Sequence, residues 1–72
     1  MEYDTGIKEK LEFFMDEKIK IHIKKKDRQF LNGFIIEKKQ DNVFVMNEDK
    51  LGKILLFVCD VWLVSVYREV KL

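Results

Sequence analysis

The sequence predicts a small all-β protein, a strongly bent five-stranded antiparallel barrel with a short N-terminal α-helix. Helical periodicity is confined to residues 5–16, and the rest of the chain divides into five short apolar segments separated by polar turns. Gly33 lies near the middle of the second segment, where a residue without Cβ lets a strand bend sharply. The 72 residues fit one domain spanning 1–72, with no linker, repeat or low-complexity segment.

The helix is predicted from one apolar stripe within residues 5–16. Four apolar residues recur at helical spacing, and charged residues occupy the other faces: Ile7, Leu11, Phe14 and Met15. Asp4 or Thr5 is suited to cap the first turn by accepting a hydrogen bond from a free backbone N–H.

Five strands are predicted after the helix, at residues 18–25, 28–38, 42–48, 53–59 and 64–69. The first alternates strictly, with Ile19, Ile21 and Ile23 on one face and polar residues on the other, which is typical of a strand with one wet face. Tight turns separate the segments, and Asp60 is expected to begin a single 3₁₀-type turn over residues 60–63.

The later strands are apolar on both faces, which indicates self-association. Between Ile54 and Tyr67 the only polar side chains are Asp60 and Ser65. The single cysteine, Cys59, excludes an intrachain disulfide, so oligomerisation is the expected source of extra stability for so short a chain. Because an exposed apolar edge aggregates unless it is paired, we expect the last two strands to meet another copy, through Leu55, Phe57, Trp62, Val64, Val66 and Tyr67. A head-to-tail contact of this kind closes into a ring if the rotation allows.

Composition excludes several classes of function. No grouping of nucleophile, base and acid, no glycine-rich phosphate loop and no metal-ligand spacing is present, so we expect no enzyme activity, metal, cofactor or small-molecule substrate. The N-terminus lacks a signal-peptide pattern, and the longest apolar run is too short for a membrane span. The free Cys59, expected to be a small buried apolar residue, fits a reducing compartment, so we expect a cytoplasmic protein.

Two basic segments are candidates for binding a polyanion, although the formal net charge is only +1. The loop after the second strand offers Lys38, Lys39, Gln40 and Asn42, whose lysines attract phosphates and whose amides hydrogen-bond. A solvated hairpin turn explains the same residues. The cluster of residues 24–28 is also typical of a solvated turn, and His22 stands without a neighbouring carboxylate or cysteine. We expect Trp62 and Tyr67 to be core or interface residues rather than stacking surfaces.

The chain resembles the Sm/LSm family, the small RNA-binding barrels that include the Hfq-related proteins. The resemblance covers residues 5–70 and rests on the element order and on IHIKKKDRQFLNGFIIEKKQDNVFV, in which an alternating strand ends in a Lys-Asp-Arg-type turn. Arg28 precedes the bent strand, and a loop ending in Asn42 follows at the family's spacing, with Gly33 one position later than the usual glycine. The resemblance implies a ring in which the fourth strand of one subunit pairs with the fifth strand of the next.

The resemblance implies RNA binding only in part. The family's uridine pocket uses an Asp, a stacking residue and an Asn in the loop before the third strand, and an Arg-Gly after the fourth. The corresponding positions here are Lys38, Gln40, Asn42 and Cys59-Asp60, so only Asn42 matches. We therefore expect a ring that binds RNA or another polyanion through a pore-side loop without the usual pocket. The alternatives are a ring that serves as a scaffold for protein partners, and an SH3-like barrel that acts as a monomer or dimer.

Overall fold

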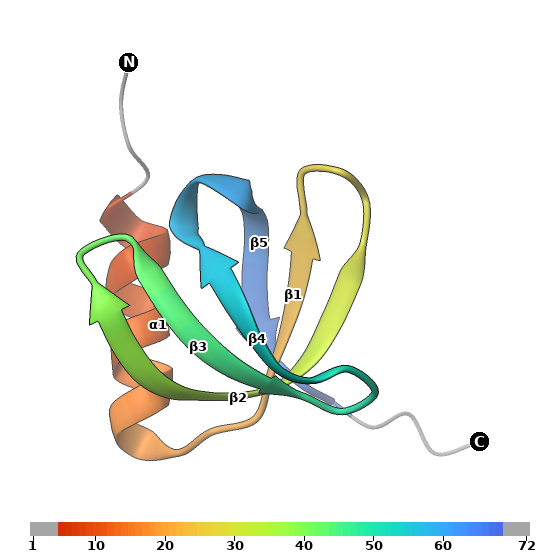
Figure 1. Ribbon diagram of the computed structural model, residues 1–72, viewed down its shortest axis with the longest axis horizontal. Helices are drawn as coiled ribbons and strands as arrows, with labels where there is room; N and C mark the ends of the chain where they lie inside the picture. Colours follow the sequence, from red (N-terminus) through yellow and green to blue (C-terminus); the bar gives the residue numbers. More distant parts are fainter. Residues whose placement is uncertain (1–4, 69–72) are drawn as a thin grey trace.

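The computed structural model describes residues 5–68 as one N-terminal helix followed by five β-strands. The element order agrees with the prediction (Figure 1). The elements are α1 (Thr5–Glu17), β1 (Ile21–Lys25), β2 (Phe30–Gln40), β3 (Val43–Glu48), β4 (Gly52–Phe57), the 3₁₀ turn η1 (Val58–Asp60) and β5 (Val61–Val66). Asp4 and Glu69, which were expected to cap the helix and to end the last strand, lie outside the described residues.

The strands form one antiparallel sheet in the order β4-β3-β2-β1-β5, and this sheet is open. The closed barrel expected from the sequence is therefore not what the structure shows: β4 and β5 are its two edges, and no ladder joins them within residues 5–68. The sheet is nevertheless strongly curled. The outer strands of a flat five-stranded sheet would lie roughly 19 Å apart, whereas the three-residue η1 that links them rises only about 6 Å.

Gly33 allows the sheet to curl, because β2 and β3 approach each other closely at this residue. Gly33 pairs with Ile21 on one side and with Glu48 on the other. A Cβ at this position would overlap the backbone carbonyl oxygen of Asn47 on β3. The irregular register expected in this strand lies further along, between Ile35 and Gln40. Gly33 thus serves the close approach of two strands and is not itself a bulge.

The helix ends in a hydrogen-bonded C-cap that delays the first strand. Lys18 adopts a left-handed conformation (φ 56°), and its N–H donates to the carbonyl of Met15 at 3.2 Å. The N–H of Ile19 donates to the carbonyl of Phe14 at 3.0 Å, which completes a Schellman motif. The motif uses residues that strand alternation had assigned to β1, so β1 begins at Ile21 rather than at residue 18.

The turn between β4 and β5 also begins earlier than expected. It occupies Val58–Asp60 rather than residues 60–63, and β5 starts at Val61. Val61 already pairs with Lys25 of β1, and the Asp60 carbonyl accepts a hydrogen bond from the N–H of Lys26 at 2.8 Å. These contacts hold Asp60 at the end of the turn instead of its beginning.

The core fills the concave side of the curled sheet, and α1 packs against β2 and β5. Ile7 and Leu11 of α1 are buried, and Phe14 and Met15 are partly buried, as the stripe predicted. The strands and η1 contribute a second set of buried residues: Ile21, Ile23, Leu31, Ile35, Phe44, Met46, Leu56, Val58, Val61 and Val64. Most side chains of the opposite, convex face are exposed or half-buried, although Val45 is buried there.

Candidate functional site

The hairpin between β2 and β3 carries the residues predicted to contact a polyanion. Lys39, Gln40 and Asn42 are exposed, and Lys38 is half-buried. Lys38 is engaged with the helix: its Nζ donates to Oε2 of Glu12 at 2.6 Å. Asp41 in the same hairpin lies 4.0 Å from Nζ of Lys8. The carboxylates of Glu12 and Asp41 therefore offset much of the positive charge that the sequence placed in this loop.

The Glu12–Lys38 pair is an electrostatic link between α1 and the hairpin. The hydrogen bond to Glu12 raises the pKa of Lys38, and the same bond lowers the pKa of Glu12. Both groups therefore stay ionised across the neutral range. Because the pair is solvent-accessible, its attraction is screened by salt and contributes little to stability.

Asn42 lies beside η1, so two segments that are distant in sequence meet at one end of the sheet. The Asn42 carbonyl accepts a hydrogen bond from the N–H of Val58 at 2.9 Å. Cys59 follows Val58 and is exposed, which corrects the expectation that it is a buried apolar residue. The three-residue turn directs its side chain outward, with Sγ 3.9 Å from Oδ1 of Asp60. Asn42 and the Cys59-Asp60 segment are thus brought together, whereas Lys38 is held by α1.

The basic segment of residues 24–28 forms the turn between β1 and β2. Asp27 makes this turn: its Oδ1 accepts the N–H of Gln29 at 3.0 Å, and its Oδ2 lies 3.8 Å from Nζ of Lys25. Arg28 occupies the left-handed region at φ 72°. These contacts stabilise the turn and neutralise part of its positive charge, which agrees with the expected solvated turn. Lys24 and Lys25 still belong to β1, and Lys24 differs from the rest of the segment because it lies against aromatic rings.

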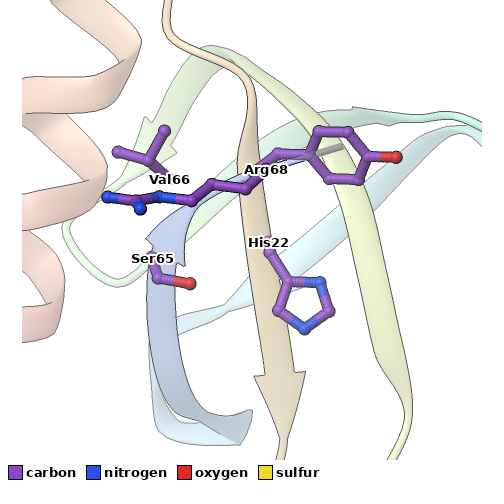
Figure 2. Close-up of a pocket in the computed structure, with 5 residues that line it drawn as sticks. His22, Ser65, Val66 and Arg68 are labelled. Atoms are coloured by element: carbon purple, nitrogen blue, oxygen red, sulfur yellow. The ribbon is translucent and has the colours of Figure 1, made fainter. Parts of the chain in front are cut away.

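His22 lies on the convex face of β1, between β2 and β5. Its Nδ1 shares a hydrogen bond with Oδ1 of Asn32, its cross-strand partner, and its ring stacks on Phe30. Figure 2 shows His22 and Ser65 projecting from neighbouring strands into one open hollow, which is also lined by Val66, Tyr67 and Arg68. Within residues 5–68 no group of three His, Cys, Asp or Glu side chains could hold a metal ion.

The predicted interface residues divide into two groups. Val64 is buried in the chain's own core. The others lie along the two sheet edges and are open to solvent, with Tyr67 half-buried: Leu55 and Phe57 on β4, and Trp62, Val66 and Tyr67 on or after β5. On β4, Leu55 and Phe57 pair with Val45 and Val43, so they share the convex face, whereas Leu56 faces the core.

Glu48 is a buried charged residue that the sequence reading did not single out. Its side chain is 5% exposed, and its two oxygens accept three backbone N–H groups. Oε2 accepts from Asn32 at 3.0 Å, and Oε1 accepts from Lys50 at 2.7 Å and Leu51 at 2.9 Å. The bond from Asn32 is the main cause that lowers the pKa of Glu48. With its oxygens occupied by backbone groups, Glu48 joins β2 to the β3–β4 turn.

Comparison with known proteins assigns no family to this chain. No protein-family model matches it, and no curated protein matches it. The one helix in the described part of the chain is too short and too polar to cross a bilayer.

Proposed function

We propose that this protein assembles into a cytoplasmic, homo-oligomeric ring of Sm-like type, in which β4 of one copy pairs with β5 of the next. One observation carries the proposal: both free edges of the open sheet bear exposed apolar side chains. Leu55 on β4 is 53% exposed, and Val66 on β5 is 45% exposed. Exposed apolar edges are aggregation sites in a monomer, and pairing them with a second copy removes the liability.

The geometry of the edges favours a ring over a symmetric dimer. β4 and β5 lie at opposite ends of the sheet order, so joining one to the other is a head-to-tail contact. Each copy then uses both edges, and a closed ring leaves neither exposed. Each half-exposed Leu or Phe side chain that becomes buried contributes about 1 kcal/mol, in addition to the new backbone ladder.

Native mass spectrometry of the protein and of an edge variant tests the assembly. Leu55→Asp with Phe57→Asp places two charges on the β4 edge, where neither side chain belongs to the core. We expect the native protein to give one defined closed oligomer larger than a dimer, and the edge variant to give a folded monomer. Lys53→Ser, an exposed change on the same strand, is the matched control and should leave the oligomer intact. A native protein that remains monomeric at high concentration would refute the ring.

Val64→Asp distinguishes the core from the edge. Val64 is buried, so the charge should unfold the chain rather than release folded monomers. Circular dichroism recorded on both variants separates the two outcomes: the Leu55/Phe57 variant keeps its β-sheet signal and Val64→Asp loses it.

A second candidate function is salt-dependent binding of RNA or another polyanion at the β2–β3 hairpin. The exposed Lys39, Gln40 and Asn42 favour it, with lysine attracting phosphate and amides bonding base edges. The engagement of Lys38 by Glu12 favours the alternative, a ring that acts as a scaffold for protein partners. Lys39→Glu tests the hairpin without breaking the Glu12–Lys38 pair, and it is included in the binding measurement described below.

A further inference from the structure

The convex face of β1, β2 and β5 presents a continuous row of rings and cations. His22 and Phe30 stack with centroids 5.3 Å apart and planes inclined by 17°. Nζ of Lys24 lies 5.6 Å from the centroid of Phe30 and 4.5 Å from the centroid of Trp62. The row His22–Phe30–Lys24–Trp62, referred to here as the aromatic row, therefore runs across three neighbouring strands.

Strand register places His22, Lys24 and Phe30, and a register shift between Leu63 and Val61 on β5 adds Trp62, which pairs with no residue of β1. Lys24 is the cross-strand partner of Phe30, and His22 is the partner of both Asn32 and Ser65. Cross-strand partners project to the same side of a sheet, so alternate residues of β1 place their side chains on the convex face beside those of β2 and β5. Ile21 and Ile23, the intervening residues, are buried in the core on the other face. The fold thus fixes the positions of the rings.

The Phe30 and Trp62 rings of the row are open to solvent. Phe30 is 57% exposed and Trp62 is 52% exposed. Single exposed aromatic residues are ordinary on protein surfaces. Here two of them flank one cation, and Phe30 also stacks on His22, so three rings and a cation form one cluster rather than an isolated apolar side chain.

The row is also electropositive. No carboxylate among residues 5–68 forms an ion pair with Lys24. Arg68 also lines the hollow at His22 and Ser65, which has a volume of about 540 Å³, and Figure 2 shows its side chain extending past Val66. Nζ of Lys20 lies 4.3 Å from the ring centroid of Tyr67 in the same region and is partly neutralised by Asp49 at 2.6 Å. The excess of cations suits a ligand that carries phosphates.

We infer that the aromatic row is a binding surface for single-stranded nucleic acid, with bases stacked on Phe30 and Trp62 and phosphates held by Lys24 and Arg68. Ring faces accept any unpaired base, whereas bases in a duplex are already stacked on one another. A cation–π contact at an exposed site is weaker than the stacking of a base on a ring, so an incoming base can displace Lys24 toward a phosphate. This inference does not depend on ring assembly.

The inference also differs from binding at the β2–β3 hairpin. The aromatic row draws on β1, the start of β2 and β5, whereas the hairpin joins the far end of β2 to β3. No residue of the aromatic row takes part in the ion pair that joins Lys38 to Glu12 of α1. The two surfaces can therefore be tested separately by single substitutions in the same protein.

The experiment is fluorescence anisotropy of a labelled 15-nucleotide single-stranded RNA titrated with the full chain at low salt. Phe30→Ala removes a stacking ring and should weaken binding by about tenfold. Phe30→Trp keeps a ring and should retain the affinity. Phe13→Ala, which removes an equally exposed ring from α1, is the matched control and should have no effect. Circular dichroism and native mass spectrometry of each variant confirm that fold and assembly are unchanged.

Trp62 provides a second readout because it is the chain's single tryptophan. We expect bound RNA to quench its fluorescence and inorganic polyphosphate to leave it unchanged. The inference is overturned if RNA does not bind, if Phe30→Ala and Phe13→Ala bind alike, or if RNA binds no better than polyphosphate. Loss of binding in Lys39→Glu but not in Phe30→Ala would assign the RNA to the hairpin instead.

Discussion

The carboxylate of Glu48 holds together two segments of the sheet, and replacing it by an amide tests this directly. In Glu48→Gln the shape of the side chain is kept but one acceptor oxygen becomes an NH₂ donor. The remaining carbonyl oxygen can serve Lys50 and Leu51, as Oε1 does in the native protein. The new NH₂ then faces the N–H of Asn32, which at 3.0 Å would place two donors against each other.

The expected loss of stability in Glu48→Gln follows from the environment of each of the three N–H groups. The N–H groups of Lys50 and Leu51 belong to exposed turn residues. Each of them keeps the amide oxygen as its acceptor or donates to water instead. The N–H of Asn32 lies in a part-buried strand and loses its acceptor, which costs about 1–3 kcal/mol. Loss of the charge-assisted character of the other two bonds adds to this, so we expect a total of about 2–4 kcal/mol. A chain of this size has a free energy of unfolding of roughly 4–11 kcal/mol, so the loss is large.

Urea denaturation followed by circular dichroism at constant protein concentration measures the change, and its pH dependence gives a second test. The pKa of Glu48 in the folded protein lies below its ordinary value of 4.5. The ionised carboxylate therefore adds stability that is fully present above that value and is lost as the pH falls through the lower folded pKa. We expect the stability difference between the native protein and Glu48→Gln to be large at pH 7 and to shrink as the solution is acidified below pH 4.5.

Glu37→Gln is the control, since Glu37 is an exposed carboxylate on β2. It should change the free energy of unfolding by less than about 0.5 kcal/mol. The reasoning is refuted if Glu48→Gln and Glu37→Gln are equally stable at pH 7, or if the loss in Glu48→Gln is the same at pH 3 as at pH 7.

Two further changes test the curl of the sheet and the link to the helix. Gly33→Ala forces a Cβ against the Asn47 carbonyl, so we expect a loss of about 1–3 kcal/mol in urea denaturation; an unchanged midpoint would show that β3 can retreat freely. Glu12→Lys alone should lower stability slightly at low salt, and combining it with Lys38→Glu should restore it because the pair is re-formed with reversed charges. Restoration that persists in 1 M salt would contradict an ionic origin, since exposed charges are screened there.

Much of the fold was predictable because the signals are local. The stripe at Ile7 and Leu11 and the alternation of Ile21 and Ile23 each specify one element and its buried face. The position of η1 was not predictable in this way. A three-residue turn inside an apolar run leaves no break in periodicity, and it is fixed by non-local contacts such as the bond from Lys26 to Asp60. The exposure of Cys59 follows from that turn and was missed for the same reason.

The candidate surfaces were less predictable because they depend on register. In the sequence Lys24 belongs to a basic cluster and Phe30 to a separate strand. Their cross-strand pairing brings them together, and the register shift in β5 brings Trp62 beside Lys24. Glu48 precedes a polar turn and looks like a solvated residue in the sequence. Its burial results from the close approach of β2 to β3 at Gly33, which no local pattern contains.

Edge pairing and the aromatic row are compatible because they share only the edge strand β5, which carries Trp62. Edge pairing uses the outward-facing backbone N–H and C=O groups of β4 and β5, which lie in the plane of the sheet. His22, Lys24 and Phe30 instead lie on inner strands and project from the convex face. Assembly through the edges would therefore leave most of the row open and repeat it once per subunit. A single strand reaching two neighbouring rows would bind the second at high effective concentration. Stacking sites that bind a strand in one copy would in this way hold it more firmly in an assembled ring, which gives self-association a direct role in binding.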